Sequence, residues 1–302
     1  MKKDYVKKQH YIPQFALKSF QNKQKRIAYT NIEKNPLRIY YSRTDNLMQE
    51  KDFYEIKSSN NYVRRNSLED DYSFFENYIS TDFKRFLELT KQPNFQCEFI
   101  KIIKNDEWAQ IEATLLFYLG TLLIRGKNVK KIFHPNSKKT TAYNYIMYLL
   151  ATTSKPYTAE IAKEMFIGQE LEVILQFIRE EEDNNPVSRL MKNIMEKYQI
   201  RIYMTEGNKK LFLSDNPVIV QKFKDQDYIL PLSPSVCMIL VPIKLKQEII
   251  MVDTKVYSLS DEDVDKLNKH SVLNSHRLVI ISNEEDLNFI EDIRVSDGKK
   301  GS

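Results

Sequence analysis

The hydrophobic pattern of this chain changes its period near residue 199, and this change restricts the folds open to the chain more than any other feature. Between Ser67 and Tyr198 apolar side chains recur every three or four residues, as they do along one face of an amphipathic helix. After Gln199 they gather instead in short β-branched runs bounded by Asn, Asp, Pro and Lys, which is typical of strands. The chain therefore combines a helical middle with a strand-rich end.

The helical middle is predicted to contain five helices. Their expected ranges are 67–89, 106–124, 138–151, 158–183 and 186–198. The second helix is apolar nearly all round between Ile111 and Ile124, so we expect it to lie inside the molecule. Ser67 is the expected N-cap of the first helix, because a serine hydroxyl accepts a hydrogen bond from a first-turn N–H group. The polar stretch 55–66 before it is predicted to be a surface loop.

Strands are predicted at both ends of the chain. Near its start, runs at 26–30 and 37–41 flank a turn with the sequence NIEKNP. Beyond residue 199 seven apolar runs are expected to be strands: IRIYMTE, KLFLSD, PVIVQKF, YILPLSP, VCMILVPI, EIIMVD and HRLVIIS. A helix at 261–273, capped by Ser260, precedes the last of them. Strands distant in sequence often share a sheet within one domain. We therefore predict an α+β fold, in which a helical middle segment is flanked by strands from both chain ends that form a mostly antiparallel sheet.

One domain is expected to cover residues 1–296. It has a basic, β-containing segment at 1–65, a helical segment at 67–198 and a β-rich segment at 199–296. Residues 297–302, which include the polar stretch GKKGS, are expected to form a disordered tail.

Composition excludes several classes of protein. With 42% hydrophobic residues the chain is able to bury a sizeable core, and with 6 Gly and 10 Pro it has too few turn residues for an all-β fold. It contains no GxSxG, GxxxxGKS or GxGxxG motif. Cys97 and Cys237 lie outside any CxxC pair, so they specify neither a disulfide framework nor a zinc site. The chain has no long uncharged apolar run and its start lacks the pattern of a signal peptide, so we expect a cytoplasmic protein with no membrane partner.

Positive charge is concentrated near the start of the chain. The formal net charge is +5, yet residues 1–65 hold 15 Lys and Arg against 6 Asp and Glu, a net charge of +9. Such a segment favours an anionic partner such as nucleic acid, and tyrosines within it provide rings for base stacking. The alternative is that the lysines only keep a polar extension in solution. The residues expected to contact nucleic acid are Lys7, Lys8, Tyr11, Arg26 and Arg125.

Three stretches, KKQHYIPQFALKSF, LFLSDNPVIV and ILPLSPSVCMIL, resemble the hallmark motifs of the bacterial family known as domain of unknown function 4238. The resemblance spans nearly the whole chain. It includes an LEDDYSFFE helix with Glu69 and Glu76, and a helix end at Arg125. The chain departs from the expected pattern at Gly126, where a Pro is expected soon after the Arg. The family has no established activity, so the resemblance implies an architecture and a set of residues of interest, but no reaction.

His10 lies in the first of these motifs and is the leading candidate for proton transfer. Imidazole is the side chain whose ordinary pKa lies closest to neutral pH, which suits a general acid or base. The chain has only 4 histidines, and none of them forms an HxH or HExxH pattern. The alternative is that His10 donates an N–H to a backbone carbonyl and fixes the opening segment to the sheet.

Asp215 follows the run LFLS and precedes Asn216 and Pro217, so it is expected at a strand end, where catalytic carboxylates are often placed. The alternative is an ordinary turn, in which the side chain bonds the backbone two residues on. Glu69 and Glu76 are two helical turns apart and share a face. Together with Asp215 they could hold Mg²⁺ or Mn²⁺ through oxygen ligands, or they could be a solvated acidic stripe.

These features lead to one main hypothesis and two alternatives. The main hypothesis is a bacterial effector of the antiphage defence or toxin kind that acts on nucleic acid as a metal-dependent nuclease. His10 would be its acid/base, and Asp215 with Glu69 or Glu76 would be the catalytic carboxylates that hold the cation. The first alternative is a non-catalytic binding or sensor module of a defence system, in which His10 only braces the opening segment. The second is an enzyme that acts on a small nucleotide.

Overall fold

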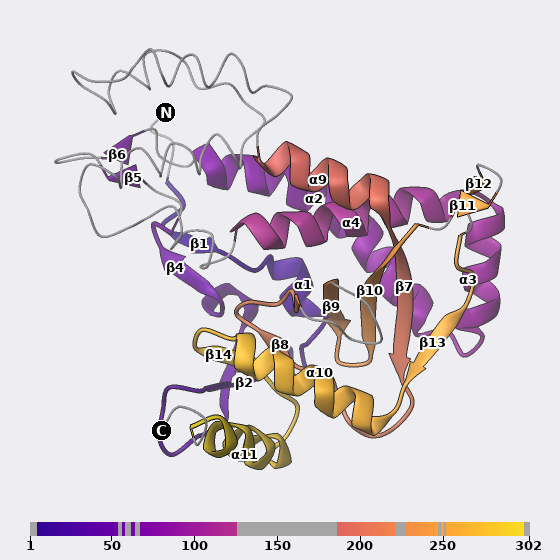
Figure 1. Cartoon of the computed structure of the whole chain (residues 1–302). Helices are drawn as coiled ribbons and strands as arrows, with labels where there is room; N and C mark the ends of the chain where they lie inside the picture. The colour runs from indigo at the N-terminus through magenta and orange to yellow at the C-terminus, as the bar shows by residue number, and fades with distance from the viewer. Residues whose placement is uncertain are drawn as a thin grey trace.

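The computed structural model describes residues 5–53, 56–57, 62–63, 67–125, 186–220, 228–243, 245–246, 249–250 and 252–298 (Figure 1). These residues form helices and mostly antiparallel sheets, with strands towards both ends of the chain and helices in the middle. The predicted α+β fold is therefore confirmed. Two predicted helices, 138–151 and 158–183, lie outside the described residues.

Seven α-helices and one short 3-10 helix form within the described ranges. They are α1 (Gln14–Lys18), η1 (Thr44–Asn46), α2 (Ser67–Thr90), α3 (Phe95–Lys104), α4 (Glu107–Arg125), α9 (Pro186–Lys197), α10 (Asp261–Asn274) and α11 (Glu285–Gly298). The sequence predicted α2, α4, α9 and α10, and Ser260 caps α10 as expected by accepting a hydrogen bond from the Asp263 N–H at 3.2 Å. Helices α1, α3 and α11 were not predicted. Ser67 is the first helical residue of α2 and not the cap before it, which corrects the sequence prediction by one position.

The strands form two four-stranded sheets and three two-stranded ones. The central sheet has the order β13 (Val256–Leu259), β7 (Tyr198–Thr205), β10 (Val236–Pro242) and β9 (Tyr228–Ser233). The terminal sheet has the order β3 (Tyr40–Ser42), β2 (Ile27–Asn31), β14 (Leu278–Ile280) and β8 (Leu213–Ser214). The smaller pairs are β1 (Lys8–His10) with β4 (Gln49–Lys51), β5 (Ile56–Lys57) with β6 (Tyr62–Val63), and β11 (Leu245–Lys246) with β12 (Ile249–Ile250). Every pair is antiparallel except β13 with β7.

Three local predictions need correction. The stretch 55–66 is not only a loop, because β5 and β6 lie within it. The run PVIVQKF shows a single bridge, between Ile219 and Ile229, and 221–227 lie outside the described residues. Helix α11 reaches Gly298, so the first two residues of the expected tail are helical.

The terminal sheet joins the two ends of the chain. Strand β2 pairs with β14 so that Tyr29 lies opposite Ile280, and β14 pairs on its other side with β8. One face of this sheet packs into the main hydrophobic cluster through Ile27, Leu213 and Ile280. The opposite face packs against helices α10 and α11 (Figure 1). Residues more than two hundred positions apart are therefore neighbours in this sheet.

The main hydrophobic cluster extends from Tyr11 to Ile280 and includes residues of α2, α3, α4, both large sheets and the opening segment. Helix α4 is largely buried, as its apolar sequence predicted: Ile111, Leu115 and Leu119 have no exposed surface. Burial of large aliphatic and aromatic side chains of this kind is the dominant stabilising contribution in a domain of this size. Among the described residues, no helix has both the length and the apolar character needed to cross a membrane.

Candidate functional site at the opening segment

The opening segment, which we define as residues 8–20, lies against α2 and α4. Its strand β1 pairs with β4, with His10 opposite Gln49. The Pro13 carbonyl then accepts the N–H groups of the first turn of α1. Phe15 of α1 packs with its ring centroid 5.0 Å from that of Phe83 on α2 and 5.2 Å from that of Tyr118 on α4. Pairing on one side and aromatic packing on the other fix the backbone on both sides of His10.

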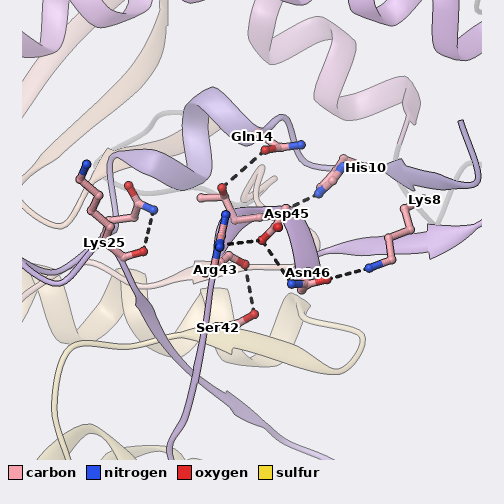
Figure 2. A network of polar contacts seen from close by, with 10 residues as sticks. Lys8, His10, Gln14, Lys25, Ser42, Arg43, Asp45 and Asn46 are labelled. Atoms are coloured by element: carbon pink, nitrogen blue, oxygen red, sulfur yellow. Dashed lines mark hydrogen bonds and ion pairs between the residues drawn. The ribbon is translucent and has the colours of Figure 1, made fainter.

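A backbone carbonyl holds the His10 side chain. Its Nε2 lies 3.1 Å from the carbonyl oxygen of Thr44 in η1 (Figure 2). Because a carbonyl only accepts, Nε2 carries the ring hydrogen, and Nδ1 is the nitrogen that can take up a proton. Only 9% of the residue is exposed, and this burial lowers the pKa of His10 below its ordinary value. The imidazole is therefore neutral near pH 7.

A network of polar contacts fixes η1 beneath this ring (Figure 2). Lys8 Nζ donates to Asn46 Oδ1 at 2.7 Å, and Asn46 Nδ2 donates to Asp45 Oδ1 at 3.2 Å. Arg43 Nε lies 3.5 Å from the same carboxylate. The sequence predicts that Lys8 contacts nucleic acid. Lys8 is exposed, and its amine holds η1, the turn that positions His10.

Arg125, the last residue of α4, is only 2% exposed and ties the opening segment to α2. Its Nη1 donates to Glu76 Oε1 at 2.8 Å, and its Nη2 donates to the His10 carbonyl at 2.5 Å. The guanidinium also lies over the Tyr72 ring, 4.4 Å from the centroid. Glu76 and Arg125, which the sequence assigned to separate roles, are therefore one ion pair.

Asp215 is 1% exposed and ties β8 to the start of β14. Its carboxylate accepts the backbone N–H of His276 at 2.7 Å and that of Arg277 at 3.1 Å, and its own N–H donates to the Leu278 carbonyl at 2.9 Å. An ordinary turn would place these bonds within two residues of Asp215, but they reach residues some sixty positions away. The carboxylate thus holds two segments of the terminal sheet together.

Tyr11 connects the His10 region with Asp215. Its side chain is buried in the main cluster, and burial raises the pKa of its phenol. The negative charge of Asp215 raises that pKa further, whereas the positive charge of Arg277 lowers it. Since Tyr11 follows His10 directly, the opening segment carries both the residue predicted to transfer a proton and a side chain on which the charge of Asp215 acts.

The carboxylates predicted to hold a cation have other partners. Glu76 is paired with Arg125, Asp215 accepts backbone N–H groups, and Glu69 lies half-buried on α2. Within the part of the chain that the structure describes, no group of three or more His, Cys, Asp or Glu side chains is placed to hold a metal ion. The predicted Mg²⁺ or Mn²⁺ ligand set is therefore not assembled from described residues.

The remaining residues predicted to contact nucleic acid lie at the surface. Lys7 precedes β1 and is exposed, and its carbonyl accepts the Asp52 N–H at 2.8 Å. Arg26 is exposed just before β2. Two tyrosines of the edge strand β3, Tyr40 and Tyr41, are also exposed. Strand β3 pairs with β2, which begins directly after Arg26.

One residue of the site was missed by sequence reasoning. Arg277 precedes β14, donates its backbone N–H to Asp215 and accepts the Ile32 N–H at 2.9 Å. Its side-chain Nε is buried and, among the described residues, has no hydrogen-bond partner. The HRLVI stretch around it marked only a buried strand, and nothing in the local sequence distinguishes this arginine from a surface cation.

Comparison with known proteins gives the chain a family. No curated protein and no solved structure matches it. A family profile described as "Protein of unknown function (DUF4238)" matches residues 8–285, which include the opening segment, Glu76, Arg125 and the Asp215 turn. This match covers most of the chain and agrees with the resemblance of its motifs, so the protein is a member of the DUF4238 family.

Proposed function

We propose that this protein hydrolyses nucleic acid in the bacterial cytoplasm, as an effector of the antiphage defence or toxin kind, and that His10 transfers the proton. The observation that carries the proposal is the state of His10: a neutral imidazole whose Nε2–H is fixed on the Thr44 carbonyl. A fixed neutral imidazole is suited to act first as a base and then as an acid. The exposed lysines beside it, Lys7 and Lys8, favour a polyanionic substrate.

In this mechanism a water molecule attacks the phosphorus of the phosphodiester, and His10 Nδ1 takes the proton that the water loses. The bond between phosphorus and the leaving sugar oxygen breaks, and the imidazolium returns its proton to that oxygen. Proton and charge balance within one turnover without a further reactant. The hypothesis also includes a divalent cation, and the assay below is run with and without one. Glu76 and Asp215, which the sequence predicted as its ligands, already have other partners.

The test is a cleavage assay with labelled single-stranded and duplex RNA and DNA, each with Mg²⁺, with Mn²⁺ and with a chelator. The matched variant is His10→Gln, because the glutamine amide can still donate to the Thr44 carbonyl but cannot transfer a proton. We expect cleavage by the wild type and a loss of about a hundredfold or more in His10→Gln at an unchanged melting temperature. His270→Gln, on helix α10, is the control. Wild-type protein that is folded and leaves every substrate intact would refute the proposal.

A second function is favoured by the same hydrogen bonds. His10, Arg125 and Asp215 each hold a backbone group in place, as residues that only brace a binding module would do. In that case a non-catalytic binding or sensor module of a defence system would use the opening segment as a binding surface and not as a reaction site. His10→Ala would then lower the melting temperature in proportion to any loss of biological effect, whereas His10→Gln would keep both.

A further inference from the structure

The backbone holds Arg277 firmly, whereas the Nε of its half-buried side chain has no hydrogen-bond partner among the described residues. Its N–H donates to the buried Asp215 carboxylate and its carbonyl accepts from Ile32, so the residue cannot move away from the terminal sheet. Its Nε is buried and unbonded, and among the described residues no carboxylate forms an ion pair with its guanidinium. Withholding water from a guanidinium nitrogen without replacing the lost hydrogen bond is costly, so such a group needs an explanation, and a bound anion beside it would supply one.

Asp215 does not neutralise this guanidinium directly. Both of its oxygens accept backbone N–H groups of residues 276 and 277, and no ion pair joins it to the Arg277 side chain within the described ranges. Its charge instead reaches Tyr11, where it opposes the charge of Arg277. Among the described residues, no carboxylate therefore engages the five N–H donors of the guanidinium.

Two tyrosines of the terminal sheet lie beside Arg277. Tyr29 on β2 and Tyr40 on the edge strand β3 are directly opposite each other, with ring centroids 5.6 Å apart. Arg277 accepts the N–H of Ile32, three residues beyond Tyr29 in the chain, and its positive charge acts to lower the pKa of the Tyr29 phenol. Burial and Tyr40 outweigh that charge and raise the pKa of Tyr29, so its hydroxyl stays protonated and able to donate. Tyr40 is 38% exposed, so part of its ring faces solvent.

These groups match the two chemical parts of a nucleotide. A guanidinium binds phosphate through paired N–H donors, and a phenol adds a further donor. An exposed tyrosine ring offers the flat apolar surface on which an unpaired base stacks, whereas a base inside a duplex is not available to it. The charge of Arg277 also acts on the phenol of Tyr11, which follows His10 in the opening segment.

We propose that Arg277, Tyr29 and Tyr40 bind one nucleotide unit of single-stranded nucleic acid, with its phosphate on Arg277 and Tyr29 and its base on Tyr40. The substrate class in this proposal rests on the proposed nuclease function. The binding site itself rests on the unbonded guanidinium and the partly exposed ring beside it.

The test measures the affinity of 5′-fluorescein-labelled 12-nucleotide oligo-U and oligo-dT by fluorescence anisotropy over a series of salt concentrations. All proteins carry His10→Gln, so that cleavage does not distort the affinity. Adding Arg277→Gln should weaken binding about tenfold or more, since a hydrogen-bonded charged contact is lost. The slope of log affinity against log salt should fall by about 0.7, the value expected for one lost phosphate contact on a single strand.

Two matched variants separate the parts of the site. Arg294→Gln removes the same charge from α11, where that arginine pairs with Glu291, and should leave affinity and salt slope unchanged. Tyr40→Ala should weaken binding about fivefold or more because stacking is lost, whereas Tyr40→Phe keeps the ring and most of the affinity. Unlabelled 5′-UMP and inorganic phosphate are added as competitors, to show whether the site takes a single nucleotide or needs the polymer. Competition by 5′-UMP supports the site, and so does binding of the polymer alone, as long as Arg277→Gln weakens that binding about tenfold or more.

Equal affinity and equal salt slope for the Arg277→Gln protein and its parent would overturn the inference, as would a parent protein that binds no oligonucleotide. The two proposals fail separately. Binding through Arg277 by a protein that cleaves nothing keeps the nucleotide site and refutes the nuclease. If the protein cleaves nucleic acid but Arg277→Gln leaves its oligonucleotide affinity unchanged, the nuclease function is kept and the nucleotide site is refuted.

Discussion

Two arginines, Arg125 at the end of α4 and Arg277 before β14, differ in whether their side chains have partners. Arg125 is buried with a carboxylate, a backbone carbonyl and an aromatic ring around its guanidinium. Arg277 has a buried Nε with no partner among the described residues, although its backbone is tightly bonded. A buried cation with partners contributes to the fold, whereas a buried donor without one reduces stability unless a ligand completes it. The comparison assigns a structural role to the first arginine and a binding role to the second.

Removing the partnered arginine should have the largest effect. Arg125→Met leaves the Glu76 carboxylate and the His10 carbonyl without their donor. We expect the free energy of unfolding in urea to fall by about 3 kcal/mol, near the lower end for a broken buried ion pair, because Glu76 is still 26% exposed. Arg85→Met, which breaks an exposed pair with Glu107, is the control and should cost less than about 1 kcal/mol. Equal losses in the two variants would contradict a structural role for Arg125.

Asp215→Asn should have the next largest effect. The amide keeps the shape of the side chain but removes the charge that accepts the His276 and Arg277 N–H groups. A hydrogen bond to a charged group contributes about 1.5–3 kcal/mol, so we expect a loss of about 2 kcal/mol in the same urea experiment. Asp45→Asn, at an exposed pair with Arg43, should change little. A stable Asp215→Asn protein would show that the carboxylate is not needed to hold β8 to β14.

Arg277→Met should act in the opposite direction from Arg125→Met. It removes the unbonded guanidinium but leaves the backbone N–H that Asp215 accepts. We expect the free energy of unfolding to stay the same or to rise by up to about 1 kcal/mol, because an unsatisfied buried donor is lost. A clear decrease would mean that the guanidinium stabilises the folded chain, and the contrast between the two arginines would disappear.

The pH dependence of stability should show the smallest effect. Burial lowers the pKa of His10 below its ordinary value of 6.5, so between these values the unfolded chain binds the proton and the folded chain does not. Stability should therefore fall as the pH is lowered through 6.5 and level off below the folded pKa. His10→Gln should reduce this decrease in unfolding experiments between pH 7.5 and about pH 5. Burial also lowers the pKa of His270, so this residue accounts for part of the decrease. The variant His270→Gln measures that part. An unchanged pH profile in His10→Gln would exclude a lowered pKa at His10.

The sequence predicted most of what depends on long periodic patterns. Helices α2, α4, α9 and α10 each carry a sustained apolar stripe, and the strands of the central sheet are long apolar runs. Helix α3 was missed because only Phe95, Phe99 and Ile102 mark its buried face. Strand β8 is shorter than its apolar run, since Asp215 and Asn216 turn the chain to bond distant residues.

The contacts of the candidate site could not be read from local sequence. The chain singled out His10, Glu76, Arg125 and Asp215, yet the pairing of Glu76 with Arg125 joins residues on two different helices. Arg277 likewise bonds the backbone of Ile32, and its charge acts on Tyr29, both from the other end of the chain. Local patterns show which residues are polar within apolar motifs, but only the tertiary fold decides which of them find partners.

The most direct test of this account is thermal unfolding of the wild type, Arg125→Met and Arg277→Gln, each with and without a saturating single-stranded oligonucleotide. A ligand that binds only the folded chain raises the melting temperature. We expect Arg125→Met to melt well below the wild type and still gain stability from the oligonucleotide. We expect Arg277→Gln to melt like the wild type without the oligonucleotide and to gain less from it, by the about 1.4 kcal/mol that corresponds to a tenfold weaker affinity. Arg277→Gln that gains as much as the wild type, or Arg125→Met that melts at the wild-type temperature, would contradict the roles assigned to the two arginines.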